Sequence, residues 1–192
     1  MPHCASINRM QQHTHRPGFD RRITAEEINL LPVARYGGPV EIISTAAGLE
    51  HAVRVLRGES LLGFDTETKP AFRRGERNPV AIIQFATAAA VYIIRIACLP
   101  SLEPLAPLFV DRKIIKAGVD LQQDIAKLRQ QLPCAYNNFI DVSHIAKDAG
   151  IKNFSMRGLA AVLLGVRVSK SARTSNWERM PLTPQQITYA AT

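Results

Sequence analysis

The chain has 192 residues, 46% hydrophobic and 21% charged, which is ordinary for a soluble globular protein and enough for one domain with a substantial core. Its 24 Lys and Arg residues outweigh 16 Asp and Glu residues, and the net charge of +8 favours a polyanionic partner, nucleic acid first and a membrane surface second. No apolar run approaches the ~18 residues needed to cross a bilayer, which excludes a membrane-spanning helix.

The cysteines and the N-terminus indicate the compartment. Cys4, Cys98 and Cys134 are odd in number and form no Cys-x-x-Cys pair, which favours free thiols under reducing conditions. The first residues lack the apolar core of a signal peptide. We therefore expect a cytoplasmic protein.

Residues 1–39 are predicted to be an N-terminal extension to a single domain over residues 40–192. Cys4 and three histidines lie in the polar first 22 residues, but their spacing matches no structural zinc pattern, so a mobile tail is the favoured interpretation. Thr24 is predicted to cap a short helix.

Alternating strand and helix patterns follow. Residues 40–43 read as a first strand, and residues 46–57 as a helix with Leu49, Val53 and Leu56 on its buried stripe. The apolar run 61–64 has the length of a buried strand.

That run ends in two carboxylates, Asp65 and Glu67. Side chains two apart on a strand share a face, so the acids project together, roughly 6–7 Å apart along the strand. Two anions this close repel unless a cation lies between them, and oxygen ligands suit Mg²⁺ or Mn²⁺.

Two other interpretations of the acidic pair stay open. Acids also gather in loops simply because loops are solvated, and a short Asp-x-Glu motif is weak by itself. The pair could also be the nucleophile loop of a haloacid-dehalogenase-like phosphatase, with Asp65 as nucleophile. Such a loop has Asp at its second position and a late acidic pair for the metal, and neither is present here.

Residues 69–77 form a basic loop beside the acids, with Lys69, Arg73 and Arg74 as candidate contacts to a phosphate backbone. A solvated turn is the alternative. Residues 80–85 and 91–96 then read as two strands paired in a meander.

A helix over residues 101–110 and a strand over 113–117 come next. Asp120 is predicted to cap the helix that follows, which buries four apolar residues: Leu121, Ile125, Leu128 and Leu132. Asp124 lies at the margin of this stripe, where burial is costly unless a cation or hydrogen-bond donors receive the carboxylate. An ordinary boundary residue is the alternative.

The C-terminal third is predicted to hold a short edge strand and three helices. Phe139 and Ile140 form the strand, and Asp141 caps the helix after it. Ser155 caps the next helix, which ends at Gly165. Its apolar stripe is Leu159, Val162 and Leu163.

A basic segment and a capped helix close the sequence. Lys170 and Arg173 lie in the segment and are further candidate contacts to nucleic acid, while the only tryptophan, Trp177, is expected to anchor the core. Thr183 opens the last helix, which carries Tyr189.

Three motifs in this order resemble those of the DEDD 3′–5′ exonucleases, in the tyrosine-bearing branch that includes ribonuclease D and the Werner helicase exonuclease domain. The motifs are 64–68 (Phe-Asp-Thr-Glu-Thr), 118–128 (from Gly118-Val119-Asp120 to Leu128) and 174–192, and the likeness covers residues 40–192. It implies an α/β fold, an RNase H-like mixed β-sheet flanked by α-helices.

The resemblance also implies roles for four residues. Asp65, Glu67 and Asp124 would bind two metal ions, with Asp65 bridging them, and Tyr189 would hold and orient the attacking water. The expected reaction releases 5′-nucleotides from single-stranded or frayed 3′ ends of RNA or DNA.

The third motif of that family is Tyr-x-x-x-Asp, and the sequence ends at Thr192, one residue before the place of the aspartate. We expect either a truncated product of a longer frame or a natural fragment with an impaired site. The sequence is thus consistent with a metal-dependent exonuclease or with a catalytically impaired nucleic-acid-binding module of the same fold. The phosphatase suggested by the acidic pair is a third hypothesis.

Overall fold

The computed structural model describes residues 19–71, 75–76 and 78–192. These residues divide into two compact units, of which the larger is Arg35–Asp141 with Ser169–Thr192 and the smaller is 19–34 with Val142–Val168. Cys4 and the three histidines of the predicted tail lie outside the described residues, as do Arg73 and Arg74 of the basic loop. The domain boundary between residues 39 and 40 stays a prediction.

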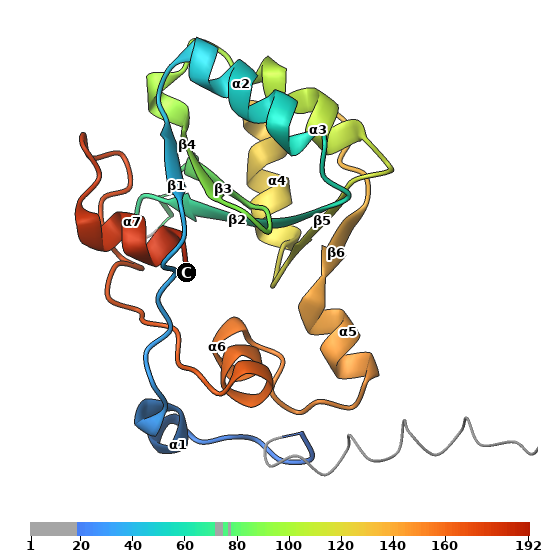
Figure 1. Cartoon of the computed structure of the whole chain (residues 1–192), viewed down its shortest axis with the longest axis vertical. Coiled ribbons are helices and arrows are strands. Elements are labelled where there is room, and N and C mark those ends of the chain that lie inside the picture. Colours follow the sequence, from blue (N-terminus) through green and yellow to red (C-terminus); the bar gives the residue numbers. More distant parts are fainter. Residues whose placement is uncertain (1–18, 72–74, 77) are drawn as a thin grey trace, which may run out of the picture. The chain divides into compact units, whose positions relative to one another are not determined.

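A six-stranded mixed sheet forms the larger unit, in the order β1-β4-β3-β2-β5-β6 (Figure 1). The strands are β1 (Val40–Ile43), β2 (Leu61–Thr68), β3 (Val80–Ala86), β4 (Val91–Arg95), β5 (Ile115–Gly118) and β6 (Phe139–Asp141). Strands β3 and β4 pair antiparallel, as predicted, and β2 adds a third antiparallel strand on the other side of β3. Strand β1 runs parallel to β4, β5 runs parallel to β2, and β6 runs parallel to β5. The predicted mixed sheet is confirmed.

Helices cover both faces of this sheet (Figure 1). On one face lie α2 (Ala46–Leu56), α3 (Ala106–Val110) and α4 (Gln122–Gln131), and on the other lies α7 (Pro184–Ala190). A 3₁₀ turn at Ile96–Cys98 follows β4, and another at Glu103–Leu105 precedes α3. The helix predicted over residues 101–110 is therefore shorter than expected, because Pro104 and Pro107 lack the N–H groups that a longer helix would use.

Each face of the sheet has its own apolar core. The core under α2, α3 and α4 contains Phe64, Phe85 and Phe109, whose ring centroids lie 5.5 to 6.2 Å apart. The core under α7 is organised around Trp177, which is 1% exposed and packs with Ile82 and Ile93. The prediction that Trp177 is a core anchor is confirmed.

The smaller unit contains α1 (Ala25–Leu30), α5 (Val142–Asp148) and α6 (Met156–Leu159), the last continuing as a π-helix over Ala160–Leu164. Thr24 and Ser155 cap α1 and α6 as predicted, and Gly165 ends the π-helix with a φ of 68°. Leu163 is exposed, so its predicted inward position is wrong. The wider π turn rotates it away from the buried stripe.

Two predictions next to the acidic residues also need correction. The acidic strand does not end at Phe64, because Asp65 to Thr68 continue to pair with β3. Asp120 does not cap α4: it has a φ of 63°, in the left-handed region that aspartate tolerates, and the helix begins after Leu121. The N–H of Leu121 is instead satisfied by the carboxylate of Asp141, from β6.

Within the described ranges, no helix combines the length and the apolar character required to cross a bilayer.

Candidate active site

Strand β2 places its two acids on one face of the sheet. Asp65 and Glu67 alternate with Phe64 and Thr66, which are buried on the face that α2, α3 and α4 cover. The acids therefore point to the opposite face, where α7 packs. Strand β5 pairs with β2 from Leu61 to Gly63, and the backbone at Asp65 and Glu67 is paired with β3.

Both acids of β2 bind protons more tightly than ordinary carboxyls. Burial, assisted by the negative charge of Asp124, raises the pKa of Asp65 to about 7, although the Thr66 N–H donates to its Oδ1 at 2.9 Å. Burial and then the charges of Asp65 and Asp124 raise the pKa of Glu67 to about 8. Three carboxylates thus act on one another in a partly buried place, which favours binding of a cation.

The third acid, Asp124, comes from the first turn of α4. The hydroxyl of Thr66 donates a hydrogen bond to its Oδ1, which joins the acidic strand to the acidic helix. Burial is the main reason that the pKa of Asp124 is raised, while the Thr66 hydroxyl and the positive charge of Lys127 act to lower it.

Tyr189 lies on α7, within the electrostatic reach of the acids. Burial, followed by the charges of Glu67 and Asp65, raises the pKa of its phenol to about 12. Its ring centroid lies 5.7 Å from that of Trp177, so the buried indole supports the phenol from one side. Helix α7 is fixed at its start by the predicted capping box, formed by Thr183 and Gln186.

Two cations flank the carboxylates. The charges of Arg173 and Lys127 both lower the pKa of Glu67, and Arg173 also lowers that of Tyr189. Arg173 is among the predicted contacts to nucleic acid, and the structure brings it to the acids. Lys170 is exposed on the same segment, and Lys69 pairs with Glu178 at 3.3 Å.

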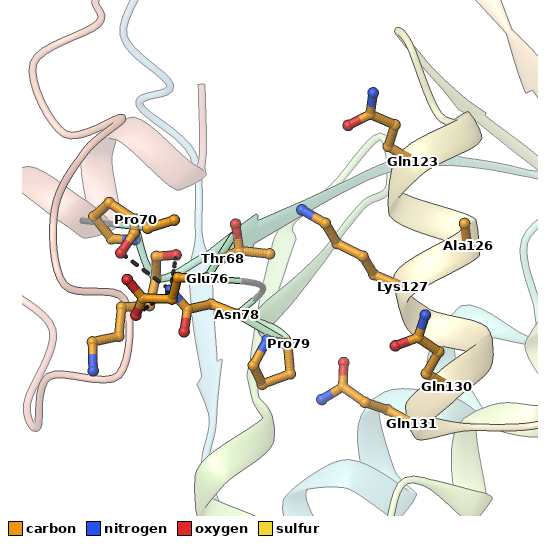
Figure 2. Close-up of a pocket in the computed structure, with 12 residues that line it drawn as sticks. Thr68, Pro70, Glu76, Asn78, Pro79, Gln123, Ala126, Lys127, Gln130 and Gln131 are labelled. Carbon is orange, nitrogen blue, oxygen red and sulfur yellow. Dashed lines mark hydrogen bonds between the residues drawn. The ribbon is translucent and has the colours of Figure 1, made fainter. Parts of the chain in front are cut away.

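A cavity of about 490 Å³ opens between the end of β2 and α4 (Figure 2). None of the three acids lines it, and its lining residue nearest to them on β2 is Thr68, which follows Glu67. We call it the α4 cavity. Its wall on α4 includes Gln123, Lys127 and Gln130, and Lys127 extends toward Thr68, the residue that follows Glu67 on the strand (Figure 2). Amide and ammonium groups on one wall and proline rings on the other suit a ligand with both polar and flat apolar parts.

The chemistry of these donors fits a divalent cation. Asp65, Glu67 and Asp124 offer only carboxylate oxygens, the ligands that Mg²⁺ and Mn²⁺ prefer, and a cation would relieve their mutual repulsion. In the described part of the chain, however, no three acid, histidine or cysteine side chains already stand together as a metal-binding group. The hydrogen bond to Thr66 accounts for this in part, because it holds the carboxylate of Asp124 on the other face of β2.

Comparison with known proteins decides the family. A family model described as 3′–5′ exonuclease matches residues 40–192. The chain belongs to this family. The predicted family membership is thereby confirmed.

Individual members of the exonuclease family show how much is shared. The chain is 32% identical to the bifunctional 3′–5′ exonuclease/ATP-dependent helicase WRN of Mus musculus over 138 residues, which is 69% of this chain and 10% of that protein. It is 30% identical to ribonuclease D of Desulfotalea psychrophila over 151 residues, 78% of this chain and 40% of that protein. The chain thus spans less than half the length of both.

Among solved structures, the EXO domain of Nibbler from Aedes aegypti has the same fold, with a TM-score of 0.75. The alignment covers 83% of this chain and 85% of that one at 23% identity. At this identity the likeness concerns the arrangement of the sheet and its helices.

Three neighbours of the acids have no sequence signal strong enough to single them out. Thr66 lies inside the first motif without a predicted role, although it donates to Asp124. Lys127 lies three residues after Asp124, and the sequence marks it only as part of the second motif. Gln84 lies opposite Asp65 on β3, and only the strand register shows this.

Proposed function

We propose that this chain is a divalent-metal-dependent 3′–5′ exonuclease that hydrolyses phosphodiester bonds at nucleic-acid 3′ ends and releases 5′-nucleotides. One observation carries the proposal. The charge of Asp124 on α4 raises the pKa of both acids of β2, and the charges of those two acids raise the pKa of the Tyr189 phenol on α7. Family membership supports the same reaction.

In this proposal Asp65, Glu67 and Asp124 hold Mg²⁺ or Mn²⁺. Such ions, when bound, lower the pKa of a coordinated water and offset negative charge on the leaving oxygen. Holding them requires Asp124 to turn from Thr66 toward the β2 acids. Deprotonation accompanies binding, because pKa values of about 7 for Asp65 and about 8 for Glu67 leave the first about half protonated and the second mostly protonated in neutral solution.

Tyr189 is proposed to position the attacking water. A phenol with a pKa of about 12 stays protonated at neutral pH, so it serves as a hydrogen-bonding group and not as a base. Its ring packs with that of Trp177, which supports the position of the phenol.

The substrate is proposed to be RNA or DNA with a single-stranded or frayed 3′ end. The α4 cavity is lined by Thr68, the residue after Glu67, and its volume has room for a terminal nucleotide. Lys127 and Arg173 would contact the phosphates near the 3′ end, and Lys170 and Lys69 would contact phosphates further along the nucleic-acid strand. The net charge of +8 supports a polyanionic substrate. The cytoplasmic location stays a prediction.

The test uses oligonucleotides of one sequence as RNA and DNA, labelled at the 5′ end or at the 3′ end. With Mg²⁺ or Mn²⁺ we expect stepwise shortening of the 5′-labelled strand, and the 3′ label leaving as a mononucleotide with a 5′-phosphate. A non-catalytic binding module would show salt-dependent binding without any shortening at high Mn²⁺. Turnover of small phosphate esters through a phospho-aspartate would indicate the phosphatase.

A further inference from the structure

Gln84 is buried beside the acidic pair without a partner for its amide. The residue is 5% exposed, and its Nε2 has no hydrogen-bond partner among the described residues. Leaving a buried donor unpaired typically costs about 1–3 kcal/mol. Such a group therefore points to an acceptor that is in place only in another state of the site.

The strand register identifies this acceptor. In the antiparallel pair of β2 and β3, Gln84 lies directly opposite Asp65, and directly opposed side chains share a face with their Cβ atoms about 4.5–5.5 Å apart. On its other side Gln84 lies opposite Ile93 of β4, which offers no acceptor. Within this row of the sheet Asp65 is the acceptor that the amide can reach.

One carboxylate oxygen of Asp65 is available to accept a hydrogen bond. Its Oδ1 accepts the N–H of Thr66, while no hydrogen bond to Oδ2 is found among the described residues. An amide that donates to a metal-binding carboxylate fixes the direction of that carboxylate, and losing such a support typically weakens metal binding about 10–100-fold.

We propose that Gln84 is a positioning residue, whose side-chain amide donates a hydrogen bond to Oδ2 of Asp65 when that carboxylate holds a divalent cation. The inference rests on the proposed function, since it assumes that Asp65 is a metal ligand. Gln84 itself touches neither the cation nor the nucleic acid.

The test is titration with Mn²⁺ alone, without nucleic acid, on the full chain and on Gln84→Met, which keeps the length of the side chain and removes the donor. We expect the variant to bind Mn²⁺ about 10–100-fold more weakly. Its metal-free thermal unfolding midpoint should be unchanged or higher, because the amide has no partner to lose. If Gln84 had only a structural role, the variant would unfold at a lower temperature and bind Mn²⁺ with unchanged affinity. Unchanged Mn²⁺ affinity would overturn the proposal.

Lys116→Met is the matched control. Lys116 is likewise a buried polar residue, but it lies on the other face of the sheet and donates to the carbonyls of Asp111 and Ile114. Its replacement should lower the unfolding midpoint and leave Mn²⁺ affinity unchanged.

Two further measurements keep the inference separate from the proposed function and from folding defects. If Asp65→Asn binds Mn²⁺ with the same affinity as the unaltered chain, the assignment of the metal site is wrong. If Asp65→Asn abolishes binding and Gln84→Met does not weaken it, only the role of Gln84 is wrong. In the unaltered chain, the side-chain amide NMR signals of Gln84 should shift on addition of Mg²⁺, and unchanged signals would contradict the proposal.

Discussion

The hydroxyl of Thr66 donates to the carboxylate of Asp124, across 58 positions of sequence. This hydrogen bond joins the central strand β2 to α4. It also fixes the position of the Asp124 carboxylate in the metal-free chain, from which this acid would move to bind a cation. Thr66 is buried and Asp124 is partly buried, so the bond is partly shielded from water and joins a neutral donor to an acceptor that can be charged.

Replacing Thr66 with valine should destabilise the chain by about 1.5–3 kcal/mol, the typical contribution of a hydrogen bond to a charged group. The shape of the side chain is kept, so the loss reports the hydroxyl. Thr66→Ser restores the donor and serves as the control. Urea unfolding at pH 8 measures the difference, and equal stability of the valine and serine variants would show that the bond contributes nothing.

The raised pKa of Glu67 predicts how the stability of the metal-free chain changes with pH. The folded chain holds this proton up to about pH 8, whereas the unfolded chain releases it near the ordinary value of 4.5. The folded state therefore binds more protons in this window, and the free energy of unfolding falls as pH rises from about 4.5 to about 8. Above that range the contribution of Glu67 is constant.

Glu67→Gln removes this contribution. The variant should be more stable than the unaltered chain at pH 8 by about 1–3 kcal/mol, the usual cost of an uncompensated buried polar group, and about equally stable near pH 4.5. Saturating Mg²⁺ should reverse the order at pH 8, because the unaltered chain offers all three carboxylates and gains more from the cation than the variant does. Thermal unfolding at both pH values, with and without Mg²⁺, gives the four comparisons. A variant less stable at pH 8 without metal would contradict the raised pKa.

Much of this arrangement could be predicted from local pattern. The apolar run before Asp65 marks a buried strand, and Thr183 with Gln186 marks the start of α7, because both signals depend on neighbours in sequence. The cap of α4 could not be predicted: its acceptor, Asp141, lies 20 residues downstream on another strand. The partners of Asp124 and Asp65 depend in the same way on tertiary packing and strand register.

Tyr189→Phe tests the proposed role of the phenol. Because its pKa is about 12, we expect loss of a positioning hydrogen bond and not of a base. The turnover number should fall about a hundredfold, with KM changed only a few-fold. The ring contact with Trp177 should survive, so the fluorescence of this single tryptophan should stay the same. A normal turnover number with unchanged fluorescence would remove Tyr189 from the mechanism.

Lys127→Gln tests the cation beside the acids. Its loss removes a charge that lowers the pKa of both Glu67 and Asp124, so half-saturation with Mn²⁺ at fixed concentration should need a higher pH. Binding of a single-stranded oligonucleotide in Ca²⁺ should also weaken and lose about 0.7 of its log–log salt slope, as expected for one phosphate contact. An unaltered pH dependence and salt slope would show that Lys127 only lines the cavity.

The central claim is that the acids of β2 and α4 act together through divalent cations on a 3′-terminal phosphodiester. The most direct measurement is release of a 3′-terminal labelled nucleotide from a single-stranded oligonucleotide, with Mn²⁺ or Mg²⁺ and with EDTA, by the unaltered chain and by Asp65→Ala. We predict release only with the metal and only with Asp65 present, while the variant keeps its fold. Release that persists in EDTA or in Asp65→Ala would contradict the account.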